Sequence, residues 1–221
     1  MGKPIIAVIV EDHPATTAGV RVWCAQADPP IELIDVGDRL AELWTEPATM
    51  ADVVIFDLHL DDRDGRIPVP EYGALTELVD AGRSVIVYSS SSNPDTITRC
   101  MSLGVDTYLT KHEGPEHLVP AIVKAAAHLP HTAPTLAGTI QADKRVRLST
   151  QERDALRAWF QTGSKQLAAQ RLGVSARTVE TYIDRARIKY ANLGRPAGSI
   201  AALIRRALED HVVTVEDLAT E

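Results

Sequence analysis

The feature that most limits the fold is an alternation of short apolar runs with helical patterns over the first 128 residues. Five runs of strand length, mostly β-branched and nearly all apolar, lie at 5–10, 31–36, 52–57, 84–89 and 107–110. Strands that are covered on both faces give such unbroken apolar runs. Segments with helical spacing or capping residues follow them at 14–26, 36–44, 71–82, 93–104 and 115–128. The pattern predicts an α/β fold, a doubly wound five-stranded parallel sheet whose ligand site lies at the carboxyl ends of the strands.

Polar side chains stand at several of these carboxyl ends. Glu11 and Asp12 follow the first strand, Asp57 ends the third, Ser89 ends the fourth and Lys111 follows the fifth. Three carboxylates brought together repel one another unless a cation lies among them, and oxygen ligands with open water positions suit Mg²⁺. An activated aspartate can take a phosphoryl group as an acyl phosphate, whose oxygens a metal and Lys111 would stabilise. Single acids and lysines commonly end strands, so none of these residues indicates a site by itself. Their occurrence together at one edge of the sheet is what indicates a functional site.

The charge of the chain is divided between two parts. Residues 1–125 hold 9 Lys and Arg against 20 Asp and Glu, whereas residues 144–206 hold 14 Lys and Arg against 4 Asp and Glu. The basic part is either a solvated surface or a binding surface for a polyanion such as DNA. Between the two parts lies a stretch rich in Pro, Thr, Ala and Gly without amphipathic period, which is typical of a linker. We therefore expect an N-terminal domain at 1–128, a linker at 129–146, a small all-α domain at 147–211 and a tail at 212–221.

The basic part contains two helical segments separated by a tight turn. The stretch "SKQLAAQRLGVSARTVETYIDRARIKY" has Gly173 in the turn and Ser175 as a helix N-cap, after a helix that opens at Ser149 or Thr150. This is the spacing of a helix-turn-helix, whose second helix enters the major groove of DNA. Its core stripe is predicted to be Val179, Ile183, Ala186 and Tyr190.

Ten residues are candidates for contact with double-stranded DNA. They are Lys165, Ser175, Arg177, Thr178, Glu180, Thr181, Asp184, Arg185, Arg187 and Lys189. The basic side chains and Ser175 are assigned mainly to phosphates, which dominate affinity. A carboxylate cannot bind a phosphate, so Glu180 either accepts from a cytosine amino group or pairs with Arg177.

The N-terminal part resembles the receiver domain of two-component response regulators over residues 4 to about 128. The resemblance rests on "IVEDHP", "VVIFD", "VIVYSS" and "YLTK". It implies that Asp57 accepts a phosphoryl group from a histidine kinase and that Glu11, Asp12 and Asp57 hold Mg²⁺. It also implies that Ser89 and Tyr108 form a switch pair, in which the hydroxyl moves to the phosphate and the aromatic ring rotates inward.

The C-terminal part resembles the LuxR-type helix-turn-helix through "LSTQER", the Leu-Gly-Val-Ser turn and "RARIKY". The whole chain is thus similar to NarL/FixJ-type response regulators. This resemblance implies a transcription regulator that binds a two-fold operator as a homodimer, with RNA polymerase as a further partner. The dimer would form through an amphipathic helix with Ile200, Leu203, Ile204 and Leu208 on one face.

Two other readings remain open. Receivers usually have a Met-Pro pair where this chain has Leu60 and Asp61, which favours an atypical receiver controlled by a ligand, a partner or dimerisation. A phosphatase with Asp57 as nucleophile is the remote alternative, because haloacid-dehalogenase-type enzymes have a second aspartate where this chain has His59. His59 is expected to be a partly exposed loop histidine, with an influence on how fast an acyl phosphate hydrolyses as the alternative. We therefore expect no enzyme and no catalytic residue.

The N-terminus and the cysteines indicate the compartment. The apolar run at 5–10 is too short for a signal peptide or a membrane span. Cys24 and Cys100 have no metal-ligand spacing and make no disulfide framework, which favours a reducing cytoplasm.

Overall fold

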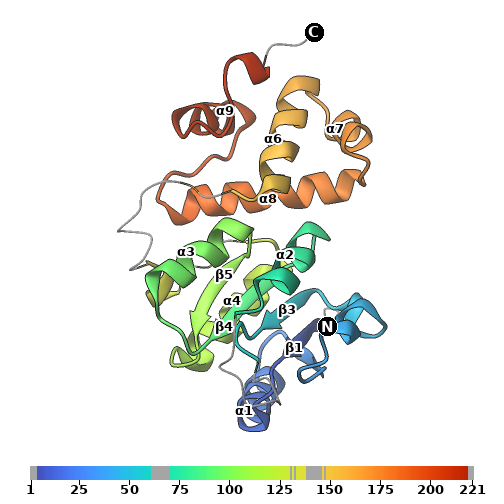
Figure 1. The fold of residues 1–221 in the computed structure, drawn as a ribbon, viewed down its shortest axis with the longest axis vertical. Coiled ribbons are helices and arrows are strands. Elements are labelled where there is room, and N and C mark those ends of the chain that lie inside the picture. Colours follow the sequence, from blue (N-terminus) through green and yellow to red (C-terminus); the bar gives the residue numbers. More distant parts are fainter. Residues whose placement is uncertain are drawn as a thin grey trace.

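The computed structural model describes residues 4–60, 70–129, 131, 133–137, 146 and 148–218. The N-terminal domain contains a five-stranded sheet in the order β2-β1-β3-β4-β5, with every neighbouring pair parallel (Figure 1). The strands are β1 Ile5–Val10, β2 Ile31–Asp35, β3 Val53–Phe56, β4 Val85–Ser89 and β5 Thr107–Thr110. Each lies within one residue of its predicted bounds, and the doubly wound fold class is confirmed.

Helices cover both faces of this sheet. Helices α1 (Pro14–Ala25) and α4 (Gly114–Ala126) contact each other on one face, and α2 (Tyr72–Asp80) and α3 (Pro94–Leu103) do so on the other. The strands are accordingly buried, and all four residues of β3 are completely inaccessible. The unbroken apolar runs therefore reflect burial on both faces.

The helix expected at 36–44 is wrong. The segment between β2 and β3 instead forms two short 3-10 helices, η1 (Leu40–Trp44) and η2 (Ala48–Met50). Before η1, the side chain of Asp35 accepts a hydrogen bond from the backbone N–H of Gly37 at 2.9 Å, which makes a side-chain turn. The few residues that remain suit a 3-10 turn, which proteins use in short pieces.

The C-terminal domain consists of helices. They are α6 Thr150–Thr162, α7 Lys165–Leu172, α8 Ala176–Asn192 and α9 Ile200–Glu209, followed by the 3-10 turn η3 Glu216–Leu218. Ser149 and Glu152 form a reciprocal capping box at the start of α6. Gly173 ends α7 in the left-handed conformation at φ +68°, and Ser175 caps α8 by accepting from the N–H of Thr178. The predicted turn, cap and core stripe of the helix-turn-helix are confirmed, since all four stripe residues belong to the buried core of this domain.

Part of the predicted linker packs on the N-terminal domain. Ala133 and Leu136 are completely buried in its core. The backbone N–H of Thr135 donates to the carboxylate of Glu113 at 2.9 Å. Residues 130, 132 and 138–145 of that predicted linker lie outside the described residues, as do residues 61–69.

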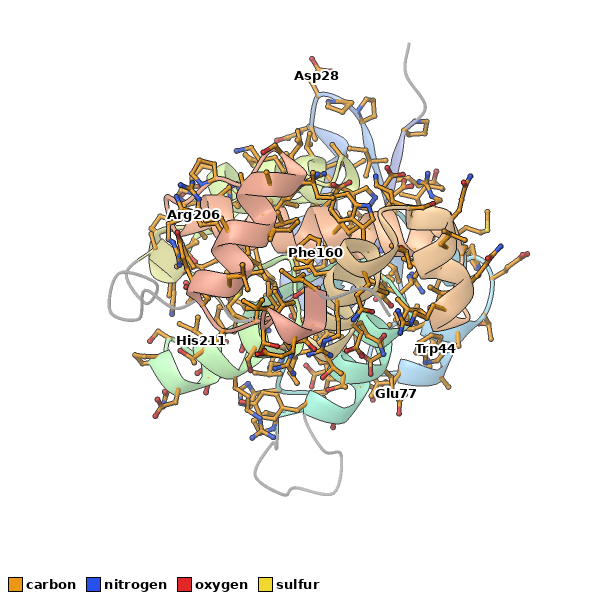
Figure 2. The ribbon with its side chains drawn as sticks, turned by 90° about the horizontal axis from the view of Figure 1, so that it is seen from above. Asp28, Trp44, Glu77, Phe160, Arg206 and His211 are labelled. Carbon is orange, nitrogen blue, oxygen red and sulfur yellow. The ribbon has the colours of Figure 1, made fainter. Side chains whose placement is uncertain are left out.

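Within the C-terminal domain, helix α8 lies on the side that faces the N-terminal domain (Figure 1). The Tyr182 hydroxyl donates to the carbonyl oxygen of Asp80 at 2.8 Å, and Arg185 Nε lies 3.3 Å from Asp106 Oδ1. Seen from above, the C-terminal helices cover this end of the N-terminal domain, with Phe160 near the middle of the view (Figure 2). Asp106 directly precedes β5, and Asp80 lies before β4. The C-terminal domain therefore docks at the amino edge of the sheet, opposite the carboxyl ends of the strands.

None of the helices in the described ranges is long and apolar enough to cross a membrane.

Candidate functional site

The pairing of β1 with β3 places the first acids beside Asp57. Val10 is in register with Phe56, so the residues that follow, Glu11 and Asp57, leave the sheet side by side. The backbone N–H of Asp57 donates to the carbonyl of Val10 at 2.9 Å. Glu11 is 2% exposed and Asp57 3% exposed, so these carboxylates are buried at the strand ends rather than solvated in a loop.

Lys111 joins the two buried carboxylates. Its Nζ lies 2.6 Å from Glu11 Oε2 and 2.7 Å from Asp57 Oδ2. Burial lowers the pKa of Lys111, but the hydrogen bonds and charges of Asp57 and Glu11 outweigh this and raise the pKa above its usual range. Lys111 is therefore a fixed cation within reach of any group bound to Asp57.

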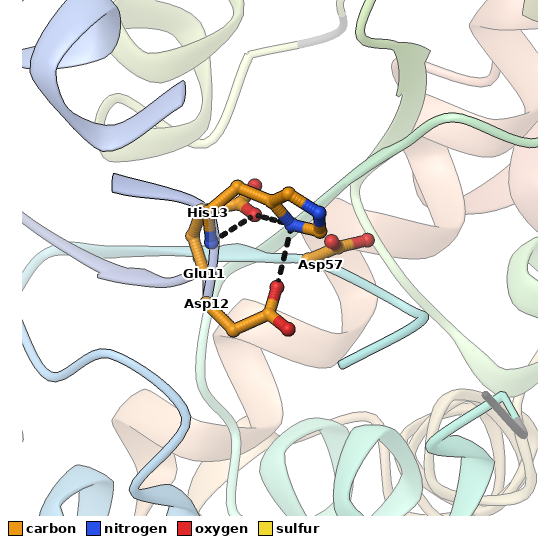
Figure 3. A group of neighbouring side chains, drawn as sticks. All are labelled: Glu11, Asp12, His13 and Asp57. Carbon is orange, nitrogen blue, oxygen red and sulfur yellow. Dashed lines mark hydrogen bonds and ion pairs between the residues drawn. The ribbon is translucent and has the colours of Figure 1, made fainter. Parts of the chain in front are cut away.

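The cluster also includes a histidine that the sequence reasoning missed. Ligand atoms of Glu11, Asp12, His13 and Asp57 lie within 4.8 Å of one another (Figure 3). His13 Nδ1 lies 2.7 Å from Asp12 Oδ1 and 3.0 Å from Glu11 Oε1. Slight burial lowers the pKa of His13, but the charge of Asp12 and the hydrogen bonds to both acids raise it overall. The signal was present, because His13 directly follows the acid pair in sequence.

The donor set fits a divalent cation. Three carboxylates beside one ammonium leave an excess of two negative charges when His13 is neutral, which a hard dication would balance. An open cleft of about 360 Å³ reaches the acid pair from the β2 side, with room for metal-bound water. It is lined by Glu11, Asp12, Pro14, Thr17, Asp35, Gly37 and Asp38.

Ser89 and Tyr108 lie behind the cluster. Ser89 is completely buried, and its Oγ lies 3.3 Å from Nδ1 of His59. The backbone N–H of His59 in turn donates to Asp57 Oδ1 at 3.2 Å, so His59 connects the phosphoacceptor candidate to the hydroxyl. The Tyr108 ring is already inward and completely buried, with its hydroxyl donating to the carbonyl of Ser91 at 2.7 Å.

The ten candidate DNA contacts fall into two groups. Eight of them are exposed or half-buried: Lys165, Ser175, Arg177, Thr178, Glu180, Thr181, Asp184 and Arg187. Arg185 and Lys189 are 2% and 5% exposed, because both face the N-terminal domain. Lys189 also pairs with Glu152 of α6 at 2.8 Å. In this arrangement neither side chain can reach a phosphate, and Lys189 connects α8 both to α6 and to the carbonyl of Met101 in the receiver.

The predicted dimer face of α9 is only partly available. Leu203 is completely buried in the core of the C-terminal domain, whereas Ile200 is 39% exposed and Ile204 and Leu208 are half-buried. Leu203 therefore holds α9 to its own domain, and the other three remain candidates for a contact between chains.

A family model described as the response regulator receiver domain matches residues 7–123, which is more than half of the chain. The chain belongs to this family. The matched residues include Glu11, Asp12, Asp57, Ser89 and Lys111, and so cover the whole carboxyl-edge cluster. The receiver domain is thus the described N-terminal domain.

Relatives extend the similarity beyond the receiver. The nitrate/nitrite response regulator protein NarL of Escherichia coli K12 is 26% identical over 197 residues, which cover 82% of this chain and 87% of NarL. An uncharacterized transcriptional regulatory protein of Bacillus subtilis, YhcZ, is 25% identical over 186 residues, covering 80% and 85% of the two chains. These relatives are named as regulators, in agreement with the expectation that the chain is not an enzyme.

Solved structures show the same two-domain fold. RcsB of Salmonella typhimurium superimposes with a TM-score of 0.53 at 19% identity, covering 92% of this chain and 98% of that chain. A structure described as an RcsB–DNA complex gives a TM-score of 0.54 at 21% identity, covering 94% and 99%. At these identities the comparison establishes the fold alone.

Proposed function

We propose that this response regulator is a cytoplasmic, DNA-binding transcription regulator that is switched by phosphorylation of Asp57 by a histidine kinase. The observation that carries the proposal is the arrangement of Asp57, a buried carboxylate at a strand end with Lys111 Nζ at 2.7 Å and further acids beside it. The buried free thiols of Cys24 and Cys100 accord with a reducing compartment.

The chemistry at Asp57 is phosphoryl transfer. A carboxylate oxygen of Asp57 forms the new P–O bond while the P–N bond to the kinase histidine breaks, and the electron pair of that bond remains on the imidazole. Mg²⁺, held by Glu11, Asp12 and Asp57, would supply charge neutralisation for the transferred oxygens. Lys111 holds a second positive charge at the same place, so the chain stabilises developing negative charge with a group already in position.

The resting form keeps helix α8 against the receiver. Arg185 donates through Nη2 to the carbonyls of Gly82 and Arg83 and pairs with Asp106. These contacts remove a basic side chain of the recognition helix from the phosphates that it would meet on DNA. The docked form therefore lowers the affinity for DNA.

The docking contact carries an internal cost. Arg185 is buried, yet its Nη1 has no hydrogen-bond acceptor among the described residues. A buried donor that stays unsatisfied costs about 1–3 kcal/mol, which offsets part of what Arg185 gains from Asp106 and the two carbonyls. Phosphorylation then has to supply only the remaining difference to shift the protein towards the released form.

Strands β4 and β5 connect the phosphorylation site to the docking surface. Ser89 and Lys111 stand at their carboxyl ends, and Arg83 and Asp106 stand just before their amino ends. A movement of Ser89 towards a phosphoryl group on Asp57 would pull on β4, whose other end contacts Arg185. Phosphorylation thereby releases α8, and the released chains pair through α9 on a two-fold operator, where RNA polymerase is a further partner.

Intact-mass measurement after incubation with acetyl phosphate and Mg²⁺ tests the first step. We expect one added phosphoryl group on the wild type, none on Asp57→Asn, and a strong reduction when EDTA removes Mg²⁺. The Glu32→Gln variant changes an exposed acid on β2, outside the cluster and its cleft, and serves as the control that keeps the adduct. Absence of an adduct with any phosphodonor would favour control of this receiver by a ligand, a partner or dimerisation.

A further inference from the structure

Glu180 stands on the exposed side of the recognition helix. It is the fifth residue of α8, within the amino-terminal half that contacts base edges in helix-turn-helix proteins. Its side chain is 52% exposed. It belongs neither to the core stripe of α8 nor to the side that meets the receiver through Tyr182, Arg185 and Lys189. Glu180 is therefore accessible even while the receiver covers α8.

Cations surround this carboxylate. Lys165, the first residue of α7, places Nζ 2.5 Å from Glu180 Oε1. The hydrogen bond and charge of Lys165, with smaller effects of Arg177 and Arg187, hold the pKa of Glu180 below its usual range. Glu180 thus stays ionised, and Lys165 fixes the direction of its side chain. Asp184, one turn further along α8, is a second acid on this face and pairs with Arg187 at 3.0 Å.

The only base groups that suit an ionised carboxylate in the major groove are amino groups. Cytosine presents its N4 amino group as a donor there, whereas guanine presents two acceptors that would repel Glu180. Adenine presents its N6 amino group as a donor beside the N7 acceptor, so it attracts a carboxylate at one atom and repels it at the next. Phosphates are excluded by charge. Because Lys165 and Arg177 offset the charge of Glu180, while Arg187 offsets that of Asp184, the carboxylate can approach the groove without preventing DNA binding.

We propose that Glu180 is a specificity-determining residue that selects a cytosine in each half-site by accepting a hydrogen bond from its N4 amino group, with Lys165 positioning the carboxylate. This inference rests on the proposed DNA-binding function, and it specifies one base that the recognition helix would recognise.

Selection of duplexes from a random pool by the full chain, with acetyl phosphate and Mg²⁺ present, tests the inference. We expect the wild type to prefer cytosine at one position of each half-site by roughly tenfold. Glu180→Ala should lose the preference at that position alone. Glu180→Gln should move the preference towards adenine, because an amide both donates to and accepts from the adenine edge.

Glu42→Gln is the matched control. Glu42 is another carboxylate that an arginine, Arg39, holds at 2.5 Å, but it lies on η1 of the receiver, outside α8 and the proposed dimer helix α9. This variant removes the same charge and should keep the wild-type site unchanged.

The outcomes separate the two proposals. A selected site whose base preferences are the same in Glu180→Ala, with affinity raised equally for every sequence, overturns the role of Glu180 and leaves the DNA-binding function intact. Failure of the wild type to select any sequence overturns the DNA-binding function and the inference with it.

Discussion

Tyr108 connects β5 to the loop after β4 through a buried phenol. Burial raises its pKa to about 12, against an ordinary value of about 10. A raised pKa in the folded state means that folding favours the neutral phenol. The resulting stability is fully present below pH 10 and is lost as the pH rises towards 12.

Replacement of Tyr108 by Phe should therefore alter the alkaline stability. Between pH 8 and pH 11 we expect the wild type to lose about 1.4 kcal/mol more unfolding free energy than Tyr108→Phe, as measured by urea titration. At pH 8 the variant should be less stable by about 1 kcal/mol, because the hydrogen bond to Ser91 is missing. Tyr88, whose pKa burial likewise raises to about 12, is present in both proteins and its effect cancels. Identical pH dependence of the two proteins would contradict the assigned burial of the Tyr108 hydroxyl.

The residues of the carboxyl-edge cluster were predictable to different degrees. Glu11, Asp12, Asp57 and Lys111 followed from the strand pattern, because parallel strands bring their carboxyl ends to one edge whatever the side chains do in detail. His13 was missed although it directly follows the acid pair, and His59 was noted beside Asp57 without its contact to Ser89. Both contacts depend on side-chain rotamers in loops, which have no period in the sequence.

Gly104 marks a close approach between helix termini of the two domains. It ends α3 at φ +112°, a conformation that other residues rarely adopt. A Cβ at this position would lie 2.7 Å from Val79 Cγ1 and 2.9 Å from Ser149 Cβ. Ser149 caps α6, so a side chain at Gly104 would press on both the receiver and the DNA-binding domain.

Two glycine variants distinguish the cost of a positive φ from the cost of a steric clash with Val79 and Ser149. Gly163 has a positive φ of +65° but would have no heavy atom within 4 Å of an added Cβ, so Gly163→Ala measures the backbone cost alone, about 1–2 kcal/mol. We expect Gly104→Ala to be less stable than Gly163→Ala by roughly 1–3 kcal/mol, as judged from urea unfolding. Equal destabilisation would contradict the close packing of Val79 and Ser149 around Gly104.

The helices and strands that were predicted well are those determined by interactions between residues close together in the sequence. The buried strands and the caps at Ser149 and Ser175 were predicted well, because apolar runs and capping hydroxyls act within a few residues. The helix at 36–44 was wrong, since a side-chain turn at Asp35 shortened it to a 3-10 helix. Burial of Ala133 and Leu136 was missed because two apolar residues among Pro and Thr give no amphipathic period.

The docking of α8 on the receiver was not predictable from the sequence. It depends on single long-range contacts, such as those of Tyr182 and Arg185, between residues about a hundred positions apart. Arg185 contacts the receiver in this structure and is proposed to contact DNA after release, so its sequence context is that of a DNA contact. Its burial is therefore a property of the whole molecule.

The affinity of the full chain for DNA tests the link between the two domains most directly. Asp106→Asn weakens the pair with Arg185 but keeps an oxygen to accept from the Val85 N–H, and it lies on the receiver, away from DNA. Asp95→Asn, at the start of α3, removes an exposed charge as a control. The duplex would carry the sequence that the phosphorylated chain selects.

Without a phosphodonor, we predict that Asp106→Asn binds this duplex roughly tenfold more tightly than the wild type, because a factor of ten corresponds to about 1.4 kcal/mol of lost docking energy. Asp95→Asn should bind as the wild type does, and acetyl phosphate should raise the affinity of the wild type but not that of Asp57→Asn. Equal affinities for the resting wild type, the phosphorylated wild type and Asp106→Asn would contradict control of DNA binding by release of α8.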